Sequence, residues 1–453
     1  MSKKSSKTVF VCTDCGSEYV KWQGQCVDCK AWNTLTSLSV NAGVPQRTGF
    51  TGQLEPPRKL NEVSAQESPR IVAGIGELDR VLGGGLVPGS AVLISGNPGA
   101  GKSTLLIQVM CRLAQQHAAL YVTGEESLSQ VAMRAKRLAL PMAELEIMSE
   151  TSCDRLLGVW NDINPKIVVI DSIQVMHCDG VDAAPGGVAQ VRESAALLIR
   201  QAKQTNTILL LVGHVTKDGN LAGPRTLEHM IDTFIMLEGD GDSRYRTLRS
   251  GKNRFGAINE LGVFAMTDKG MQEVANPSAI FLSRNSQETP GSTVMVIWEG
   301  TRPLLLEVQA LVDESALGSP RRVAVGLEQN RLNMLLAILH RHGGLQVGDQ
   351  DVFVNAVGGI RVEETSSDLA LILAVASSFR NFSLPSDLVC FGEVGLSGEV
   401  RPVPNGQERL REAAKHGFKT AIVPEGNRPK SKIKDLEIVP VATLKDALSV
   451  ILV

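Results

Sequence analysis

The sequence has few aromatic residues, almost no net charge and no long apolar run, and each shortage excludes a class of protein. Only 4 % of its 453 residues are aromatic, which argues against a base-stacking surface for single strands. A net charge of −2 gives no basic field over the whole chain, so nucleic-acid binding would need local patches. The sequence contains no apolar run of roughly 18 residues, so it predicts no membrane span, and the first residues lack a secretory signal. We therefore expect a cytoplasmic protein without membrane contact.

Cysteines are too few for a disulfide scaffold, but four of the eight form a cluster. Two C-x-x-C pairs, Cys12 with Cys15 and Cys26 with Cys29, are separated by ten residues. Each pair can form a tight knuckle, and two knuckles supply four thiolates for a tetrahedral zinc ion. A module of about 25 residues cannot bury a stable core without metal. We expect structural Zn²⁺ at residues 8–35, with disulfide pairing as the alternative.

Composition and periodicity divide the rest of the chain into three parts. Residues 36–70 are rich in Ser, Gly, Pro and Gln and are predicted to be a linker. In residues 71–275, short apolar strands alternate with amphipathic helices, which predicts an α/β domain with a doubly wound parallel sheet. Residues 276–453 are predicted to form a separate α+β domain. The expected strands of the central domain are 91–95, 119–124, 167–171 and 207–213, and the clearest helices are 102–116 and 188–204.

A glycine-rich loop follows the first of these strands and precedes a helix. GNPGAGKST fits the pattern G-x-x-x-x-G-K-[ST], in which glycines let the backbone wrap around a triphosphate. Lys102 would neutralise the β and γ phosphates, and Ser103 would hold Mg²⁺. The motif predicts an ATP and Mg²⁺ site formed by Gly96, Asn97, Pro98, Gly99, Ala100, Gly101, Lys102, Ser103 and Thr104.

Three acidic residues follow apolar strands and are candidates for catalysis. Asp171 ends the strand IVVID, where a carboxylate would face the nucleotide and reach Mg²⁺; its alternative role is a helix N-cap. Glu125 and Glu126 end another strand, and hydrolysis needs a carboxylate that orients the attacking water. Acids at a helix start also complement the helix dipole, so both readings stay open. We prefer Glu125 as the catalytic residue.

The segment GIGELDRVLGGGLVPGS at 74–90, leading into the phosphate loop, resembles the RecA-like ATPase family. Together with the cysteine segment, GKNRFG at 251–256 and FGEVGLSGEVRPVPNGQERLREAAKHGF at 391–418, it is similar to the bacterial RadA (Sms) family over nearly the whole chain. The resemblance implies a homo-hexameric, DNA-dependent ATPase with a motor like that of replicative helicases. It also implies a translocase or helicase on single-stranded and branched DNA, acting in homologous recombination and repair with the RecA recombinase.

The resemblance also assigns roles at two strand ends. Glu125 matches the catalytic glutamate of RecA-like ATPases, and His214 matches the position before their second DNA-binding loop. The segment after His214 is rich in Gly, Asn and Pro and contains Lys217 and Arg225 as candidate DNA contacts. A nucleotide contact at His214 could then be coupled reciprocally to DNA binding by this loop. An ordinary surface loop is the alternative.

Five basic residues and no acid lie between positions 244 and 254, ending in the GKNRFG segment. In a ring ATPase such cations can reach the γ-phosphate bound by the neighbouring subunit. In a DNA motor they can hold the phosphodiester backbone instead. We expect one of Lys252 and Arg254 to contact the neighbour's nucleotide and the other DNA, without assigning which. A solvated basic turn is the alternative.

The C-terminal region resembles the proteolytic domain of Lon, in which a lysine activates a serine nucleophile. Ser367 falls at the serine position, but the lysine position is occupied by Gln407, whose amide cannot accept the serine proton. We therefore expect a scaffold without peptidase activity, with an ATP-dependent peptidase as a rival interpretation. An ATP-switched DNA clamp is a second rival. Basic residues of this region that could contact duplex DNA are Arg401, Arg409, Arg411 and Lys415.

Overall fold

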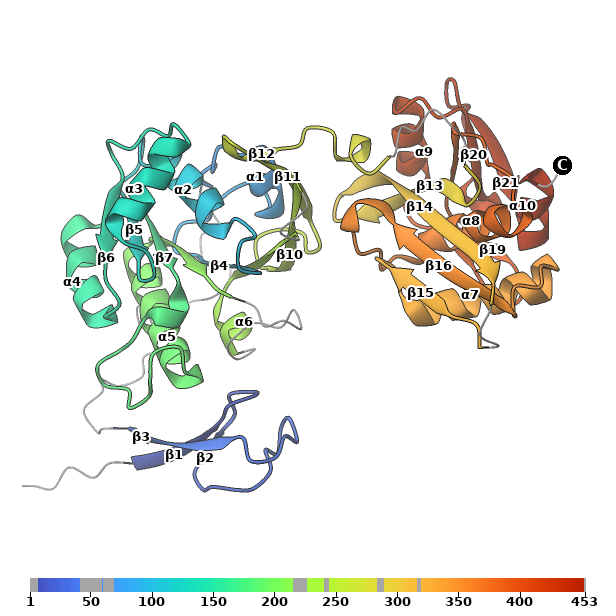
Figure 1. The fold of residues 1–453 in the computed structure, drawn as a ribbon. Coiled ribbons are helices and arrows are strands. Elements are labelled where there is room, and N and C mark those ends of the chain that lie inside the picture. Colours follow the sequence, from blue (N-terminus) through green and yellow to red (C-terminus); the bar gives the residue numbers. More distant parts are fainter. Residues whose placement is uncertain are drawn as a thin grey trace, which may run out of the picture. The chain divides into compact units, whose positions relative to one another are not determined.

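The computed structural model describes residues 7–40, 59, 69–214, 226–239, 244–282, 289–315 and 319–451. The chain divides into two compact units, Met1–Val274 and Ala275–Val453 (Figure 1). The first unit contains a small three-stranded sheet and a large nine-stranded sheet, and the second is built on a seven-stranded sheet. In the part of the chain that is described, every helix is too short or too polar to cross a bilayer.

The N-terminal module is a ribbon of three antiparallel strands with very little core. Its strands are β1 (Lys7–Cys12), β2 (Glu18–Tyr19) and β3 (Leu35–Val40), in the order β2-β1-β3. The buried cluster consists of Cys12, Cys26 and Leu35, with a few half-buried neighbours. Such a cluster is far too small to offset the entropy of ordering the chain, so the ribbon needs another source of stability.

The large sheet confirms the predicted doubly wound α/β arrangement at its centre. The six strands in the order β9-β4-β8-β7-β5-β6 are all parallel. Their bounds are β4 (Ala91–Gly96), β5 (Ala119–Thr123), β6 (Glu146–Ser149), β7 (Ile167–Asp171), β8 (Ile208–Val212) and β9 (Thr233–Glu238). Because parallel strands place their carboxyl ends at one edge, the loops that follow β4, β5, β7 and β8 lie at the same edge.

Three antiparallel strands extend this sheet beyond β9, and the sequence analysis did not anticipate them. They are β10 (Tyr245–Asn253), β11 (Leu261–Thr267) and β12 (Gly270–Glu273), in the order β12-β11-β10-β9. The short connections between them leave no room for the crossover helix that a parallel strand requires. The basic stretch between positions 244 and 254 is therefore mostly strand rather than loop.

Helices cover both faces of the large sheet because its strands are apolar on both sides. In β4, Val92 and Ile94 join the core beneath one group of helices, whereas Ala91 and Leu93 join the core beneath the other. This alternation follows from the two-residue period of a strand. The first group is α1 (Gly76–Val81), α2 (Lys102–Leu113) and α3 (Leu128–Arg137), and the second is α4 (Cys153–Ile163), α5 (Val188–Thr205) and α6 (Thr226–Met230).

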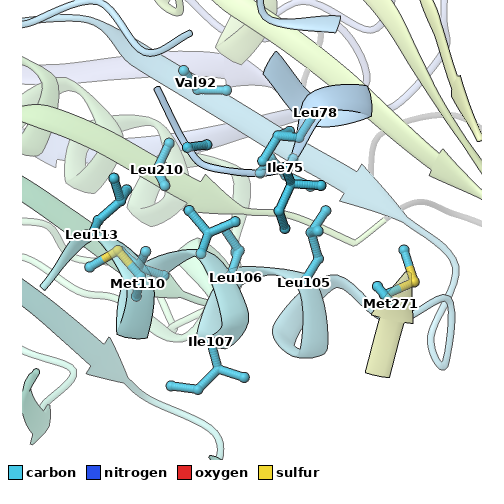
Figure 2. Packing of buried hydrophobic residues seen from close by; sticks show 14 of the residues in the cluster. Ile75, Leu78, Val92, Leu105, Leu106, Ile107, Met110, Leu113, Leu210 and Met271 are labelled. Carbon is cyan, nitrogen blue, oxygen red and sulfur yellow. The ribbon is translucent and has the colours of Figure 1, made fainter. Parts of the chain in front are cut away.

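Helix α2 is fixed to the sheet by a row of fully buried apolar side chains. Figure 2 shows Leu106 and Met110 facing the sheet, where Val92 of β4 and Leu210 of β8 belong to the same cluster. Burying one such side chain stabilises the fold by about 1.5–3 kcal/mol. Because α2 begins directly after the glycine-rich loop, this packing also holds the loop at the carboxyl edge of the sheet.

The second unit is the α+β domain that the sequence predicts, built on one mixed sheet. The strand order is β15-β16-β14-β13-β17-β20-β21. Its elements are β13 (Ser292–Glu299), β14 (Arg302–Glu314), β15 (Arg322–Val325), α7 (Gln329–Gly343), β16 (Gln350–Ala356), α8 (Asp368–Arg380), β17 (Leu388–Cys390), α9 (Gly406–Lys415), β20 (Thr420–Pro424), β21 (Glu437–Val441) and α10 (Leu444–Ile451). A hairpin of β18 (Glu393–Val394) and β19 (Val400–Arg401) lies outside this sheet.

The prediction that Arg409 could contact duplex DNA is wrong, because its side chain has 0 % exposed surface. Its Nη1 donates to the carbonyl of Val296 at 2.6 Å, and its Nη2 is paired with Glu364. The guanidinium carbon also lies 5.9 Å from the ring centre of Trp298 and 5.8 Å from that of Phe391. Arg409 therefore belongs to the core. The other three predicted cations, Arg401, Arg411 and Lys415, are exposed, and each forms an ion pair with a glutamate nearby in the sequence.

Replacing Arg409 by Met should destabilise the second unit by about 1–3 kcal/mol, because the half-buried Glu364 and the carbonyl of Val296 lose their charged hydrogen-bond donor. The matched change Arg411→Met, on the exposed side of the same helix, should alter stability by no more than about 0.5 kcal/mol. Calorimetric unfolding of the full chain measures both. Equal effects of the two substitutions would show that Arg409 is not part of the core.

Candidate active site and zinc ribbon

The glycine-rich loop connects β4 to α2, and two of its glycines are required, one by a close backbone contact and one by its backbone conformation. A Cβ on Gly96 would lie 2.2 Å from the carbonyl oxygen of Leu237 on the neighbouring strand β9. Gly101 has φ +106°, and a Cβ there would lie 2.6 Å from Cε of Met266. At Gly96 the obstacle is the backbone of β9, so a side chain there would push the loop away from that strand. At Gly101 the positive φ itself disfavours a side chain.

The Lys102 ammonium lies within the loop. Its Nζ donates to the carbonyl oxygens of Gly96 at 2.7 Å and Asn97 at 3.1 Å. Burial lowers the pKa of Lys102 below its ordinary value, and the negative charges of Asp171 and Glu125 partly oppose that shift. The site thus combines a cation in the loop with two carboxylates close enough to influence its titration.

Asp171 is held at the end of β7 by a side chain from the adjacent strand. Tyr121 of β5 donates from its hydroxyl to Oδ2 of Asp171 at 2.5 Å. Burial and the nearby Asp171 charge raise the pKa of Tyr121 well above its ordinary value, so the phenol keeps its proton. The sequence analysis missed Tyr121, although a single hydroxyl-bearing ring in the aliphatic strand ALYVT was a signal.

Glu125 is positioned by residues that follow two other strands of the sheet. Its Oε1 accepts a hydrogen bond from the buried Ser172, which follows β7. The same oxygen lies 3.3 Å from Nε2 of His214, which follows β8. The Glu125 side chain is still 41 % exposed, so it remains accessible from solvent. Residues after three separate strands thus meet at one carboxylate. The sequence analysis named Glu125 and His214 as candidates, but it did not identify Ser172.

Glu126 points to different partners, although it is adjacent in sequence. Its carboxylate pairs with Arg134 of α3 at 2.5 Å, and its backbone N–H donates to the hydroxyl of Thr123. The helix then begins with a capping box in which Ser127 and Gln130 bond reciprocally. Glu126 therefore anchors the start of α3, which favours Glu125 as the carboxylate available for chemistry.

The remaining predicted loop residues surround the start of α2. Asn97, Pro98 and Gly99 are exposed, whereas Ala100 is buried. Ser103 and Thr104 are half-buried in the first turn of α2, which contains no acidic residue. The N–H groups and partial positive charge of a helix start suit phosphate.

Lys252 and Arg254 lie at the opposite edge of the sheet from the loop of their own chain. Strand β9 pairs Leu237 with Gly96 at its carboxyl end, and it pairs Thr233 with β10 at its amino end, beside the two cations. There Lys252 donates to the carbonyl of Glu228 in α6 at 2.5 Å and to that of Ile231, directly after α6, at 2.8 Å. Arg254 lies 3.2 Å from Asp232. Arg254 remains 52 % exposed. The other predicted DNA contacts, Lys217 and Arg225, lie outside the described residues.

The four ribbon cysteines have the geometry of a tetrahedral metal site. Their sulfur atoms all lie within 4.8 Å of one another, with 3.6 Å between Cys12 and Cys29 and 3.4 Å between Cys15 and Cys26. Zinc bound at about 2.3 Å from each of four sulfurs would separate those sulfurs by about 3.8 Å. All four cysteines are free thiols in the structure, which agrees better with metal ligands than with disulfides. The donor set fits Zn²⁺.

In the second unit, Ser367 precedes α8 and borders a cavity of about 300 Å³. Its hydroxyl donates to the carbonyl of Glu364 at 2.8 Å. The residues that line the cavity include Arg331, Asp368 and several glutamates, but neither lysine nor histidine. Gln407 is half-buried at the start of α9. The described surroundings of Ser367 thus contain no amine or imidazole that could take its proton.

Comparisons with known families assign the parts of the chain. Residues 56–220 match the AAA domain family, and residues 10–37 match the rubredoxin metal binding domain. Residues 306–427 match the family described as subunit ChlI of Mg-chelatase. The first match contains the phosphate loop with Glu125, Asp171 and His214, and the second contains the four cysteines. The central region is therefore an ATPase domain, and the N-terminal module is a metal-binding ribbon.

Curated relatives match over the full chain. The chain is 62 % identical over 453 residues to the DNA repair protein RadA of Haemophilus influenzae, and 61 % identical over 454 residues to that of Escherichia coli. It is also 43 % identical over 455 residues to the DNA repair protein RadA of Bacillus subtilis. Each alignment covers 99 % of this chain and 99 % of its relative. The chain belongs to the RadA family of DNA repair proteins.

Proposed function

We propose that the chain is a DNA-dependent ATPase that acts as a translocase or helicase on recombination intermediates and moves their branch points. Its substrates would be single-stranded and branched DNA, its working form a homo-hexameric ring in the cytoplasm, and its partner the RecA recombinase. Membership of a family of DNA repair proteins supports the role in repair. The ATPase domain supports the use of ATP.

The observation that carries the proposal is the convergence of Glu125, Ser172 and His214. In a working site, Lys102 would neutralise the β and γ phosphates, and Ser103 with Asp171 would hold Mg²⁺, which neutralises charge as the phosphoryl group transfers. Glu125, fixed by Ser172, would orient the attacking water. Each of these residues ends a strand, follows a strand or begins α2 at one edge of the sheet.

His214 gives this site a direct route to DNA. It contacts Glu125 at 3.3 Å and is followed by the segment that carries Lys217 and Arg225. DNA held by that segment would move His214, and with it the carboxylate that orients water. Because coupling of binding free energies is reciprocal, nucleotide binding would alter DNA affinity by the same factor.

The basic segment is proposed to act between subunits. Lys252 and Arg254 lie beside the amino end of β9, at the edge opposite to the loop of their own chain. They can therefore complete a nucleotide site only on a neighbouring subunit, or else hold DNA. We propose that one does each, and their bonds to the α6 carbonyls and to Asp232 fix the segment until the partner arrives.

The second unit is proposed to act as a scaffold without peptidase activity. A serine is a weak nucleophile at neutral pH and needs an adjacent base. Ser367 instead donates to the carbonyl of Glu364, and both Lys415 and Lys419 are exposed, with Lys415 paired to Glu412. The ribbon is proposed to bind structural Zn²⁺ through Cys12, Cys15, Cys26 and Cys29, which would supply the stability that its small core lacks.

Changing Glu125 to Gln should leave nucleotide binding nearly unchanged and lower ATP turnover by about 10²–10⁴-fold, because the general base is lost. Strand displacement on forked and three-strand DNA should be lost with it, since a motor needs hydrolysis. The matched change Glu126→Gln should retain most turnover, because the Glu126 carboxylate is paired with Arg134 of α3. Turnover assays and unwinding assays with ATP and a non-hydrolysable analogue measure these effects.

Two results would contradict this assignment. Normal turnover in Glu125→Gln with loss in Glu126→Gln would reverse the roles of the two acids. DNA binding that responds to ATP without any strand displacement by the parent protein would favour the rival interpretation of an ATP-switched clamp.

Metal analysis of the purified chain should find about one zinc per chain, and Cys26→Ser should remove it, because three thiolates bind far more weakly than four. Cys178→Ser, which changes a half-buried cysteine outside the ribbon, should retain full zinc content. Full zinc in Cys26→Ser would exclude the proposed site.

Replacing Lys252 or Arg254 by Ala distinguishes a DNA contact from a contact with the neighbour's nucleotide. Loss of a phosphodiester contact should lower the slope of log affinity against log salt by about 0.7–0.9. Loss of a nucleotide contact should leave that slope unchanged and reduce DNA-stimulated turnover. Lys136→Ala, which removes an exposed cation from α3, is the control. If both variants keep the salt slope, the turnover and the unwinding of the parent, the segment is only a solvated basic turn.

A further inference from the structure

We propose that Arg246 is a positioning residue of the nucleotide site and holds the phosphate loop from behind; this inference rests on the proposed ATPase function. Arg246 lies on β10 and is only 4 % exposed. Its Nε donates to the carbonyl oxygen of Ala100 at 3.2 Å, and its Nη1 donates to that of Tyr245 at 2.9 Å. Ala100 lies in the middle of the loop, 146 positions earlier in the sequence.

The fold guides this side chain to the loop. Alternate residues of β10, Arg246, Leu248 and Ser250, are buried, and Leu248 packs in the same core as α2. Gly239 makes room for the guanidinium, since a Cβ there would lie 2.3 Å from Cδ of Arg246. The strand that carries Arg246 is thus fixed independently of the loop, and it can hold the loop rather than follow it.

Fixing the carbonyl of Ala100 also fixes the N–H of Gly101. The two groups belong to one planar trans peptide unit and point in opposite directions. When Arg246 draws the carbonyl towards β10, the N–H of Gly101 is turned away from β10. That N–H is one of the first of α2, where N–H groups and the helix dipole bind phosphate.

Arg246 differs from Lys102 in what it supplies. The lysine stem is flexible and its ammonium is a point charge, whereas the guanidinium is planar and keeps its proton at any ordinary pH. Arg246 therefore provides a fixed direction and a permanent positive charge beneath the loop. Lys102 provides a point charge on a flexible stem, which in the proposed site would neutralise the β and γ phosphates. Neither residue can replace the other.

The test compares Arg246→Met, Arg246→Lys, Lys102→Ala and the control Arg249→Met, which changes a half-buried arginine between two buried positions of the same strand. The probe is ADP with Mg²⁺, and the readouts are its Kd, the kcat and KM for ATP, and the unfolding temperature. Arg246→Met should raise the Kd of ADP by about tenfold or more, as expected for loss of a buried charged hydrogen bond. Its KM should rise more than its kcat falls, and Arg249→Met should bind like the parent.

The variants separate the possible outcomes. A lower unfolding temperature with a parent-like Kd in Arg246→Met would show a merely structural role and overturn the inference. If Arg246→Met fails to fold, Arg246→Lys provides the test, because lysine keeps the positive charge but lacks the rigid planar donors of the guanidinium. The Kd of ADP for Arg246→Lys should rise by about threefold or more, and a parent-like Kd would overturn the inference. Parent-like ADP binding and ATP turnover in Lys102→Ala would instead refute the proposed ATP site itself.

Discussion

The close approach of β9 to the end of β4 is the constraint on which the nucleotide site depends. The carbonyl of Leu237 leaves no space for a side chain at Gly96, so the last residue of β4 must be glycine. Helix α2 is then held against the sheet by fully buried leucines and by Gln108, which exchanges hydrogen bonds with the backbone of Met271 on β12. The loop between these fixed ends has little freedom left.

The antiparallel extension of the sheet forms a support for this loop. Met266 and Met271 approach Gly101, and Arg246 bonds to Ala100, so three strands added after β9 contact the loop from behind. The candidate catalytic side chains come from the ends of β5, β7 and β8. In the proposed function, the parallel strands would supply the chemistry, and the antiparallel strands would hold the phosphate loop.

The sequence predicted those features whose signals are local. The parallel strands, the phosphate loop and the paired cysteines could be identified because apolar runs and fixed spacings define them within short windows. The role of Arg409 could not, since its partners Val296, Glu364 and Phe391 are distant in sequence and turn an apparently exposed helix position into core. The different surroundings of Glu125 and Glu126 could not be predicted either, because their partners Ser172 and Arg134 lie elsewhere in the sequence.

The position of Lys252 and Arg254 has a consequence for how activity depends on assembly. If one of these cations belongs to the nucleotide site, as proposed, a chain that carries it at the edge away from its own phosphate loop could not complete that site alone. In the proposed ring, turnover would rise more steeply than linearly with protein concentration until assembly saturates. A chain with a damaged phosphate loop and a chain with a damaged basic segment could also complement each other when mixed. Each interface between two subunits would need an intact loop from one chain and an intact basic segment from the other. Catalysis would then be a property of the subunit interface rather than of the single chain.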